Sequence, residues 1–398
     1  MHEAVEHPRT GRIPYARLSA FYFFYFASLG AFIPFWSLYL QHLGLSAPRI
    51  GAAMAVVMAT KIVAPNLWGW IADHYGQRMR IIRLAGLAAV ACFAPLAFTR
   101  GFGWILFWLG AFAFFWNAAL PQFEAVTLNH LGPDSHRYAR VRLWGSVGFI
   151  LAVAGLPHWL AGPGIEQLPA VVLGLLAGIW LNTLWVPDHP GDPGAAPPLR
   201  LRAVLRRPAT LALLAACLLG QASHGPYYAF FSIYLEAHGY SREAVGLYWA
   251  LGVVAEVLVF LVIHRWLCRF GAERILLAAL LLTALRWLLL AGFVEVAPVL
   301  LGAQLLHAAS FGLLHASAIE LVHRFFPGRL QGRGQALYSS TSFGLGGALG
   351  SLYAGRLWDV MGGGGVFAAS AAVALLGAWA AWLGLARVQA RSSNGVVG

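Results

Sequence analysis

Several ionisable side chains of this chain lie inside long apolar stretches. The ones nearest the middle of such a stretch are Lys61, Glu256, Arg286 and His307. A charge at the centre of a bilayer costs at least about 2.5–3.5 kcal/mol, so such a side chain normally faces a cavity, a partner or both. Lys61 is also the only lysine of the chain. A lysine ammonium can hold a carboxylate and, unlike a guanidinium, can lose its proton when it is buried. These residue types therefore suit the binding of anions and the transfer of protons.

The two halves of the sequence are related by a shift of 195 residues. Segments 27–51 and 222–246 align without a gap and share ten identical residues among 25. The same shift superimposes Lys61 on Glu256, which places opposite charges at equivalent positions of the two repeats. We expect the two residues to face one central cavity. A static ion pair and a lysine that snorkels to the membrane surface are the alternatives.

The elements that must position these residues are membrane-spanning helices. The chain is 60% hydrophobic and only 11% charged, whereas a soluble domain is about 45–50% apolar and about 25% charged. Apolar stretches of about 20 residues, long enough to span a bilayer, recur along the whole length. We expect twelve spans, at 18–43, 50–72, 81–99, 103–129, 140–162, 168–186, 209–236, 244–265, 273–292, 296–322, 334–357 and 366–387.

The net charge of +12 could suggest a nucleic-acid partner, but the position of the charges argues against one. Most arginines lie in the N-terminal segment, the even-numbered loops and the C-terminal tail. The positive-inside rule then places both termini in the cytoplasm. A cleavable signal peptide is not expected, because the first 16 residues are polar and the first span is too long. The three cysteines are expected to be packing residues.

An even number of spans gives the two halves the same orientation. We expect a six-helix half at 1–187, a cytoplasmic linker at 188–208, and a six-helix half with a short tail at 209–398. Parallel repeats of this kind typically enclose a substrate site near the membrane midplane. The duplication favours a transporter over a channel or a membrane enzyme. We see no selectivity loop, no metal-ligand spacing and no nucleophile–base motif, so no enzyme activity, metal or cofactor is expected.

The segment GWIADHYGQRMR (69–80) resembles the Gly-x-x-x-Asp-x-x-Gly-x-Arg loop of the major facilitator superfamily, with Gly69, Asp73, Gly76 and Arg78 at its motif positions. Other segments, among them PFWSLYLQHLGLS, VRLWGS, GVVAEV and QLLHAASFGLLH, are similar to the 3-phenylpropionate-transporter-like branch. That branch is related to lactose permease and to nucleoside:proton symporters. The resemblance implies an all-α fold of twelve helices around a central cavity, working by alternating access in a bacterial inner membrane. It also implies that Asp73 is a gate, meeting the N-terminal end of a second-half helix, for which we expect the eleventh span.

The resemblance to lactose permease implies roles for two further groups of residues. Glu124 and Arg142 match a Glu and an Arg that hydrogen-bond the substrate there, and an arginine fork suits a carboxylate or two hydroxyls. A structural salt bridge at the helix ends is the alternative. Glu256, Arg286 and His307 are similar to the set that couples protons to sugar. Ser310 stands where the permease has a second acid, so we expect Glu256 to be the proton carrier.

Further side chains are expected to line the cavity. In the tenth span Gln304, His307, Phe311 and His315 share one helical face, although polar contacts between helices would also explain them. The remaining candidates for substrate binding are Tyr25, Trp116, Asn117, Tyr227 and Tyr228.

The sequence thus predicts a monomeric proton symporter, driven by the proton gradient, for a small organic solute. The best substrate guess is an aromatic carboxylate such as 3-phenylpropionate. A sugar (galactoside-like) or nucleoside symporter is the alternative, followed by a drug or metabolite exporter and by a non-transporting receptor or scaffold.

Overall fold

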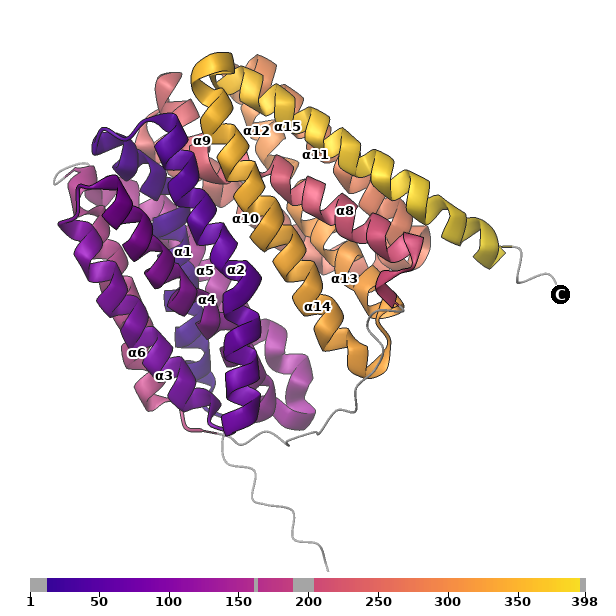
Figure 1. Cartoon of the computed structure of the whole chain (residues 1–398), viewed down its shortest axis with the longest axis horizontal. Helices are drawn as coiled ribbons and strands as arrows, with labels where there is room; N and C mark the ends of the chain where they lie inside the picture. Colours follow the sequence, from indigo (N-terminus) through magenta and orange to yellow (C-terminus); the bar gives the residue numbers. More distant parts are fainter. Residues whose placement is uncertain (1–12, 161–163, 189–203, 394–398) are drawn as a thin grey trace, which may run out of the picture.

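The computed structural model describes residues 13–160, 164–188 and 204–393, and these residues form helices and turns without any strand. Figure 1 shows the helices of the first half, in indigo to magenta, packed beside those of the second half, in pink to yellow. The first half contains α1 (Tyr15–His42), α2 (Ala47–Tyr75), α3 (Arg78–Phe93), α4 (Phe102–Leu131), α5 (Tyr138–Leu160) and α6 (Leu168–Trp185). The second half contains α8 (Pro208–Ser223), α9 (Gly225–Ala237), α10 (Arg242–Phe270), α11 (Ala272–Phe293), α12 (Ala297–Leu305), α13 (Leu314–Phe325), α14 (Gln331–Ser339) and α15 (Gly347–Ser393). Two π-helical turns, η4 (Ala308–Leu313) and η6 (Ser340–Gly346), join α12 to α13 and α14 to α15. The predicted linker at 188–208 lies largely outside the described residues.

Ten segments of the described chain are long and apolar enough to cross a membrane. The seventh predicted span is not among them, because it is broken into α8 and α9, of 16 and 13 residues. The last two predicted spans form one segment, Gln331–Leu385, which turns at Gly362 with a φ of 67°. With α8–α9 taken as one crossing and this segment as two, the fold is consistent with twelve crossings.

The break between α8 and α9 follows from a proline. Pro226 has no N–H, so the Ala222 carbonyl loses its helical partner. The hydroxyl of Tyr353 on α15 donates to that oxygen at 3.2 Å. Gly225 lets α15 approach, since a Cβ on the facing Gly350 would lie only 2.9 Å from the Gly225 Cα. The kinked helix is therefore held by α15, and it turns Tyr227 of α9 towards α10 and α11.

The two halves meet along α2 and the helix formed by η6 and α15. We call the end of the bundle at which α2 ends and α14 begins the linker end, and the opposite end the far end (Figure 1). The two elements run antiparallel in a constant register. The facing pairs are Gly51 with Gly355, Met58 with Gly347, Ile62 with Gly344, and Asn66 with Ser340. This seam extends from the far end to beyond the middle of α2.

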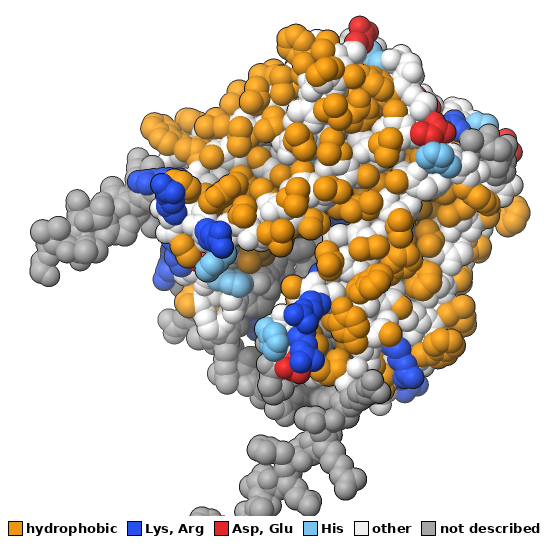
Figure 2. All heavy atoms as spheres, turned by 180° about the vertical axis from the view of Figure 1, so that it is seen from behind, with side chains coloured by type: hydrophobic (Ala, Val, Ile, Leu, Met, Phe, Trp, Pro, Cys, Tyr) orange, Lys and Arg blue, Asp and Glu red, His pale blue; other side chains and the backbone are white. Residues whose placement is uncertain are grey.

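A second seam joins α5 to α10 near the far end. Pro157 cannot donate to the Val153 carbonyl, which is left free to face the other half. Gly246 of α10 packs against this oxygen so closely that any side chain there would overlap it. At the opposite, linker end the space-filling view shows the surface hollowed between the halves, with basic side chains at its rim (Figure 2). The structure is therefore closed at the far end and open at the linker end.

We expect Gly246→Ala to disfavour this far-closed form, because the added methyl group collides with the Val153 carbonyl. Overpacking of this kind costs about 1–3 kcal/mol, which would lower the population of the form roughly 5- to 160-fold. The measurement is the labelling rate of Ile33→Cys, a position in the central cavity, by a membrane-impermeant maleimide added at the far side. The native cysteines are replaced first.

The matched control is Gly302→Ala in α12, where an added Cβ meets nothing within 4 Å. Labelling should accelerate in the Gly246 variant and stay unchanged in the control. Equal rates in the two variants would remove the α5–α10 contact from the closure of the far end.

Candidate functional site

The space between the halves contains two adjoining lobes, each of about 200 Å³. Both are bounded by Phe26, Leu29 and Ile33 of α1, whose spacing places them on one helical face. We name the lobes after their charged residues. The lysine lobe is also lined by Tyr25, Lys61, Trp116, Asn117, Ser339 and Phe343. The glutamate lobe is also lined by Arg142, Ser146, Tyr228, Trp249, Glu256 and His307.

Lys61 lies in the lysine lobe without a counter-ion. Within the described part of the chain, no carboxylate forms an ion pair with its ammonium and no hydrogen bond reaches it. The neighbouring rings of Tyr25 and Trp116 are stacked with their centroids 5.4 Å apart. Asn117 donates from Nδ2 to Thr60 Oγ1 at 2.9 Å, which fixes the amide at the edge of the lobe. The arrangement presents an unpaired cation beside an aromatic wall.

The structure does not bring Lys61 and Glu256 into contact. The two residues line different lobes, and Glu256 Oε2 instead lies 3.7 Å from Nε2 of His307. In this conformation the two repeat-related charges therefore lie in different lobes, which share the α1 residues Phe26, Leu29 and Ile33.

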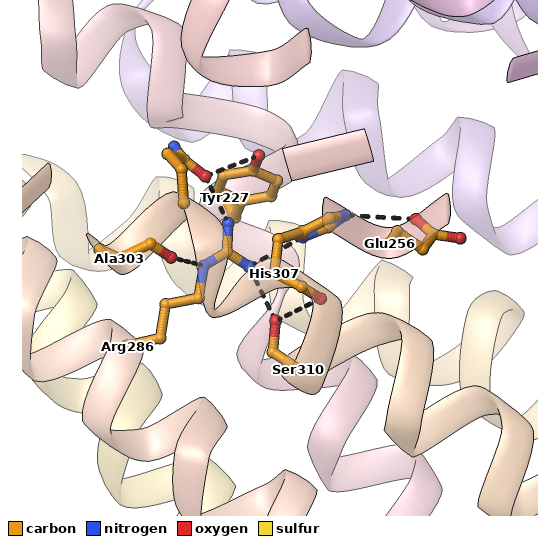
Figure 3. Close-up of polar contacts among 7 residues, drawn as sticks. Tyr227, Glu256, Arg286, Ala303, His307 and Ser310 are labelled. Atoms are coloured by element: carbon orange, nitrogen blue, oxygen red, sulfur yellow. Dashed lines mark hydrogen bonds and ion pairs between the residues drawn. The ribbon is translucent and has the colours of Figure 1, made fainter. Parts of the chain in front are cut away.

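Arg286 lies directly behind the glutamate lobe and is completely buried. Its Nε donates to the Ala303 carbonyl at 2.9 Å, and Nη2 donates to Gln304 Oε1 at 2.9 Å. Nη1 contacts His307 Nδ1 at 3.0 Å and donates to Ser310 Oγ at 2.9 Å. Figure 3 shows the guanidinium at the centre of this network, with Glu256 on the other side of the imidazole. The guanidinium thus holds the side-chain oxygen of Gln304 and the hydroxyl of Ser310, and it fixes the ring of His307.

The contact with Arg286 decides which nitrogen of His307 carries a proton. A guanidinium only donates hydrogen bonds, so Nδ1 must accept, and the hydrogen of the neutral ring is on Nε2. Nε2 faces Glu256 Oε2 at 3.7 Å, close enough for an electrostatic contact but too long for a direct hydrogen bond. Protonation of Nδ1 would set two donors against each other. His307 is therefore suited to orienting Glu256 and poorly suited to carrying a proton itself.

If the protein is the proton symporter that the sequence predicts, His307→Gln should retain part of the proton-driven accumulation of substrate, because a glutamine amide can place a donor near the position of Nε2. His307→Asn is the matched control, since its shorter side chain can accept from Arg286 but does not reach Glu256. Accumulation ratios in proteoliposomes with a pH gradient measure the difference. If both variants lose accumulation completely while still exchanging substrate, the imidazole itself carries the proton.

Arg142 and Glu124 are neighbours, but only one of them reaches the cavity. Their closest atoms, Arg142 Nε and Glu124 Oε1, are 3.9 Å apart, and Tyr138 donates to the same carboxylate oxygen at 3.2 Å. The Arg142 guanidinium lies over the Phe26 ring, 3.9 Å from its centroid, and lines the glutamate lobe. Glu124 lines neither lobe, so the structure places it behind Arg142.

Three other residues that were predicted to bind the substrate lie outside the two lobes. Tyr227 is buried beneath Arg286, with its ring centroid 4.3 Å from the guanidinium carbon. Gln304 is buried in the same network. His315 continues the ring stack of His307 and Phe311, but its Nδ1 bonds the Tyr338 hydroxyl at 2.9 Å. None of the three lines either lobe, because the bends at η4 and between α8 and α9 redirect faces that a straight helix would present to the cavity.

The loop motif at 69–80 makes its polar contacts within the first half, among the described residues. α2 ends at Gly76, whose φ of 68° is the left-handed conformation that closes helices. Asp73 forms an ion pair with Arg78, and Arg78 donates to Gln122 at 2.9 Å. Gly69 packs near the same glutamine side chain. The expected contact of Asp73 with the eleventh span is absent among the described residues, as suits a structure open at the linker end.

Sequence reasoning missed the apolar wall shared by the lobes. Phe26, Leu29 and Ile33 follow the i, i+3, i+7 pattern of a helix face, but apolar residues on a membrane helix are as easily lipid-facing. It also missed Trp249, whose Nε1 donates to Ser232 at 3.1 Å.

Comparison with known proteins agrees with this architecture. The model of the MFS_1 like family matches residues 15–369. The chain is 31% identical to the "Probable 3-phenylpropionic acid transporter" of Escherichia coli K12, covering 89% of this chain and 93% of that one. It is 32% identical to the "Maltose permease" of Geobacillus stearothermophilus, covering 85% and 86%.

Among solved structures, the nucleoside transporter NupG superimposes with a TM-score of 0.79 at 16% identity, covering 93% of this chain and 98% of that one. That likeness shows the fold alone. The predicted superfamily and fold class are confirmed: this multi-pass membrane protein belongs to the MFS_1 like family of major facilitator transporters.

Proposed function

We propose that the protein is a proton-coupled symporter that imports an aromatic monocarboxylate across a bacterial inner membrane. The observation that carries the proposal is the unpaired Lys61 in an aromatic lobe, next to a lobe that holds Glu256. The cation supplies the counter-charge for a carboxylate, and the rings of Tyr25 and Trp116 supply an apolar surface for an aryl group. The relationship to a probable 3-phenylpropionic acid transporter supports the same substrate class.

Coupling follows from the charges that line the two lobes. When Glu256 carries a proton, the lining charges are those of Lys61 and Arg142, which favour an anion. When Glu256 loses its proton, its carboxylate repels the bound anion and weakens binding. A proton taken up with the substrate on the acidic side and released on the other side therefore drives net uptake. No cofactor is needed, and we propose that one monomer completes this cycle.

The end that is open identifies the state of the transport cycle. The linker end is the end at which the positive-inside rule places the cytoplasm, so the structure corresponds to an inward-open state. Both termini then lie in the cytoplasm. In the opposite state the far end must open at the seams of Gly246 and Gly355, and the linker end must close.

We propose that Asp73 takes part in closing the linker end. The register of α2 against η6 and α15 pairs Ile62 with Gly344 and Asn66 with Ser340. Continued by two helical turns, the same register sets Asp73 opposite Arg333 of α14. Closure would then exchange the present ion pair of Asp73 with Arg78 for a contact between the halves.

The test is uptake by purified protein in proteoliposomes with an acidic exterior. We expect 3-phenylpropionate to accumulate, and a protonophore to abolish the accumulation. Maltose and uridine serve as the sugar and nucleoside controls and should not accumulate. Uptake of either control in place of the aryl acid would reassign the substrate class, and acid-driven extrusion would make the protein an exporter.

A further inference from the structure

The two lobes together form a cavity that is polar at both ends and apolar in the middle. Lys61 is the charged group at one end, and Arg142 and Glu256 are the charged groups at the other. Phe26, Leu29 and Ile33 of α1 line both lobes and form the apolar surface that connects them. A ligand that touches both polar ends must therefore extend along this surface.

A ligand with a polar group at only one end offers partners to the polar residues at only one end of this cavity. If its carboxylate meets Lys61, its ring lies against the α1 wall and the far edge of the ring reaches the glutamate lobe. There an unsubstituted ring would displace water from Arg142 and Glu256 and offer them no partner. Leaving a buried polar group without a partner weakens binding. The two side chains are 32% and 19% exposed, so remaining water lessens the penalty.

A hydroxyl group at the far end of the ring would restore these hydrogen bonds. It can accept from the Arg142 guanidinium, which only donates. It can also donate to the Glu256 carboxylate or accept from the protonated carboxyl, so it suits a residue whose protonation state changes during transport. A second carboxylate would suit Arg142 but would repel ionised Glu256. The chemistry of the lobe thus favours a hydroxyl over another acid.

We propose that the preferred substrate is an aryl alkanoate that carries a hydroxyl on the ring opposite its acid chain, as in 3-(4-hydroxyphenyl)propionate. Its carboxylate binds Lys61, its ring lies against Phe26, Leu29 and Ile33, and its hydroxyl lies between Arg142 and Glu256. This inference rests on the proposed function and defines the substrate of the same site more closely.

The experiment compares the affinities of the unmodified protein in detergent for 3-(4-hydroxyphenyl)propionate and 3-phenylpropionate by titration calorimetry. We expect the hydroxylated acid to bind about tenfold more tightly, as one hydrogen bond to a partly exposed charged group would give. Equal affinities, or tighter binding of the unsubstituted acid, overturn the inference but leave the proposed function standing. If neither acid binds, the proposed function itself fails.

A variant then locates the source of the preference. Arg142→Met keeps the aliphatic stem beside Phe26 but removes the donors, so the two acids should bind with affinities within about twofold of each other. Arg142→Lys, which keeps a donor, should retain part of the preference and serves if the Met variant does not fold. A preference that is unchanged in both variants places the hydroxyl elsewhere and overturns the assignment.

Discussion

Lys61→Ala should abolish measurable binding of 3-phenylpropionate. The side chain is a cation that lines the lysine lobe and has no counter-ion among the described residues, so a carboxylate would be its first strong partner. Charge-assisted hydrogen bonds in sites of low dielectric contribute about 1.5–3 kcal/mol, and loss of the charge also leaves the anion unpaired. We expect a decrease in affinity of at least about 100-fold by titration calorimetry. The variant should fold, because removing Lys61 breaks no hydrogen bond or ion pair in this structure.

Two further substitutions separate charge from shape at this position. Lys61→Arg should retain some binding but transport slowly, since a larger planar fork fits the lobe differently and does not deprotonate. Lys61→Met keeps the length and apolar stem of the lysine and should lose binding as Lys61→Ala does. Normal binding and transport by Lys61→Ala would show that the lysine is structural, and the aromatic-acid proposal would then lose its main support.

The fold could be predicted from the sequence because a bilayer allows few backbone structures. Every backbone polar group in the membrane must be satisfied internally, so long apolar stretches become helices, and the 195-residue repeat groups them into two similar halves. The structure departs from the predicted spans where a proline or a glycine changes the course of the helix. Pro226 breaks the seventh span at a point where Tyr353 can take over the freed carbonyl. Gly362 joins the last two spans by a turn so short that they read as one element.

Only part of the site could be predicted from the sequence. Charges inside apolar spans are easy to find, but the sequence does not say what they contact. A charge inside a span must face a cavity or a partner, but its position in the sequence does not say which. Lys61 and Glu256 line the cavity, whereas Arg286 is enclosed by partners on α12 and η4 and by His307 between them. The difference depends on tertiary contacts of Gln304 and Ser310, which no helical periodicity contains. Apolar lining residues such as Leu29 carry no signal at all, because the same side chain would suit lipid.

Glu256→Gln should abolish accumulation driven by a pH gradient while preserving exchange of substrate across the membrane. The amide imitates the protonated carboxyl in size and in lacking charge, so the anion still binds between Lys61 and the α1 wall. Exchange requires only that the loaded protein changes conformation. Accumulation also requires a group that binds and releases a proton in each cycle, and Glu256 is the acid that lines the described cavity.

The pH dependence of binding provides an independent readout of the same residue. In the unmodified protein, affinity for the anionic substrate should fall as rising pH removes the proton from Glu256, because the carboxylate then repels the anion. In Glu256→Gln this decrease should disappear. The matched control is Glu320→Gln on α13, an acid that is 48% exposed, pairs with Arg324 at 3.9 Å and lies outside both lobes, so it should accumulate substrate normally. If Glu256→Gln still accumulates substrate against its gradient, the proton travels on another group, and His307 becomes the residue to test, despite the hydrogen bond from Arg286 that occupies its Nδ1.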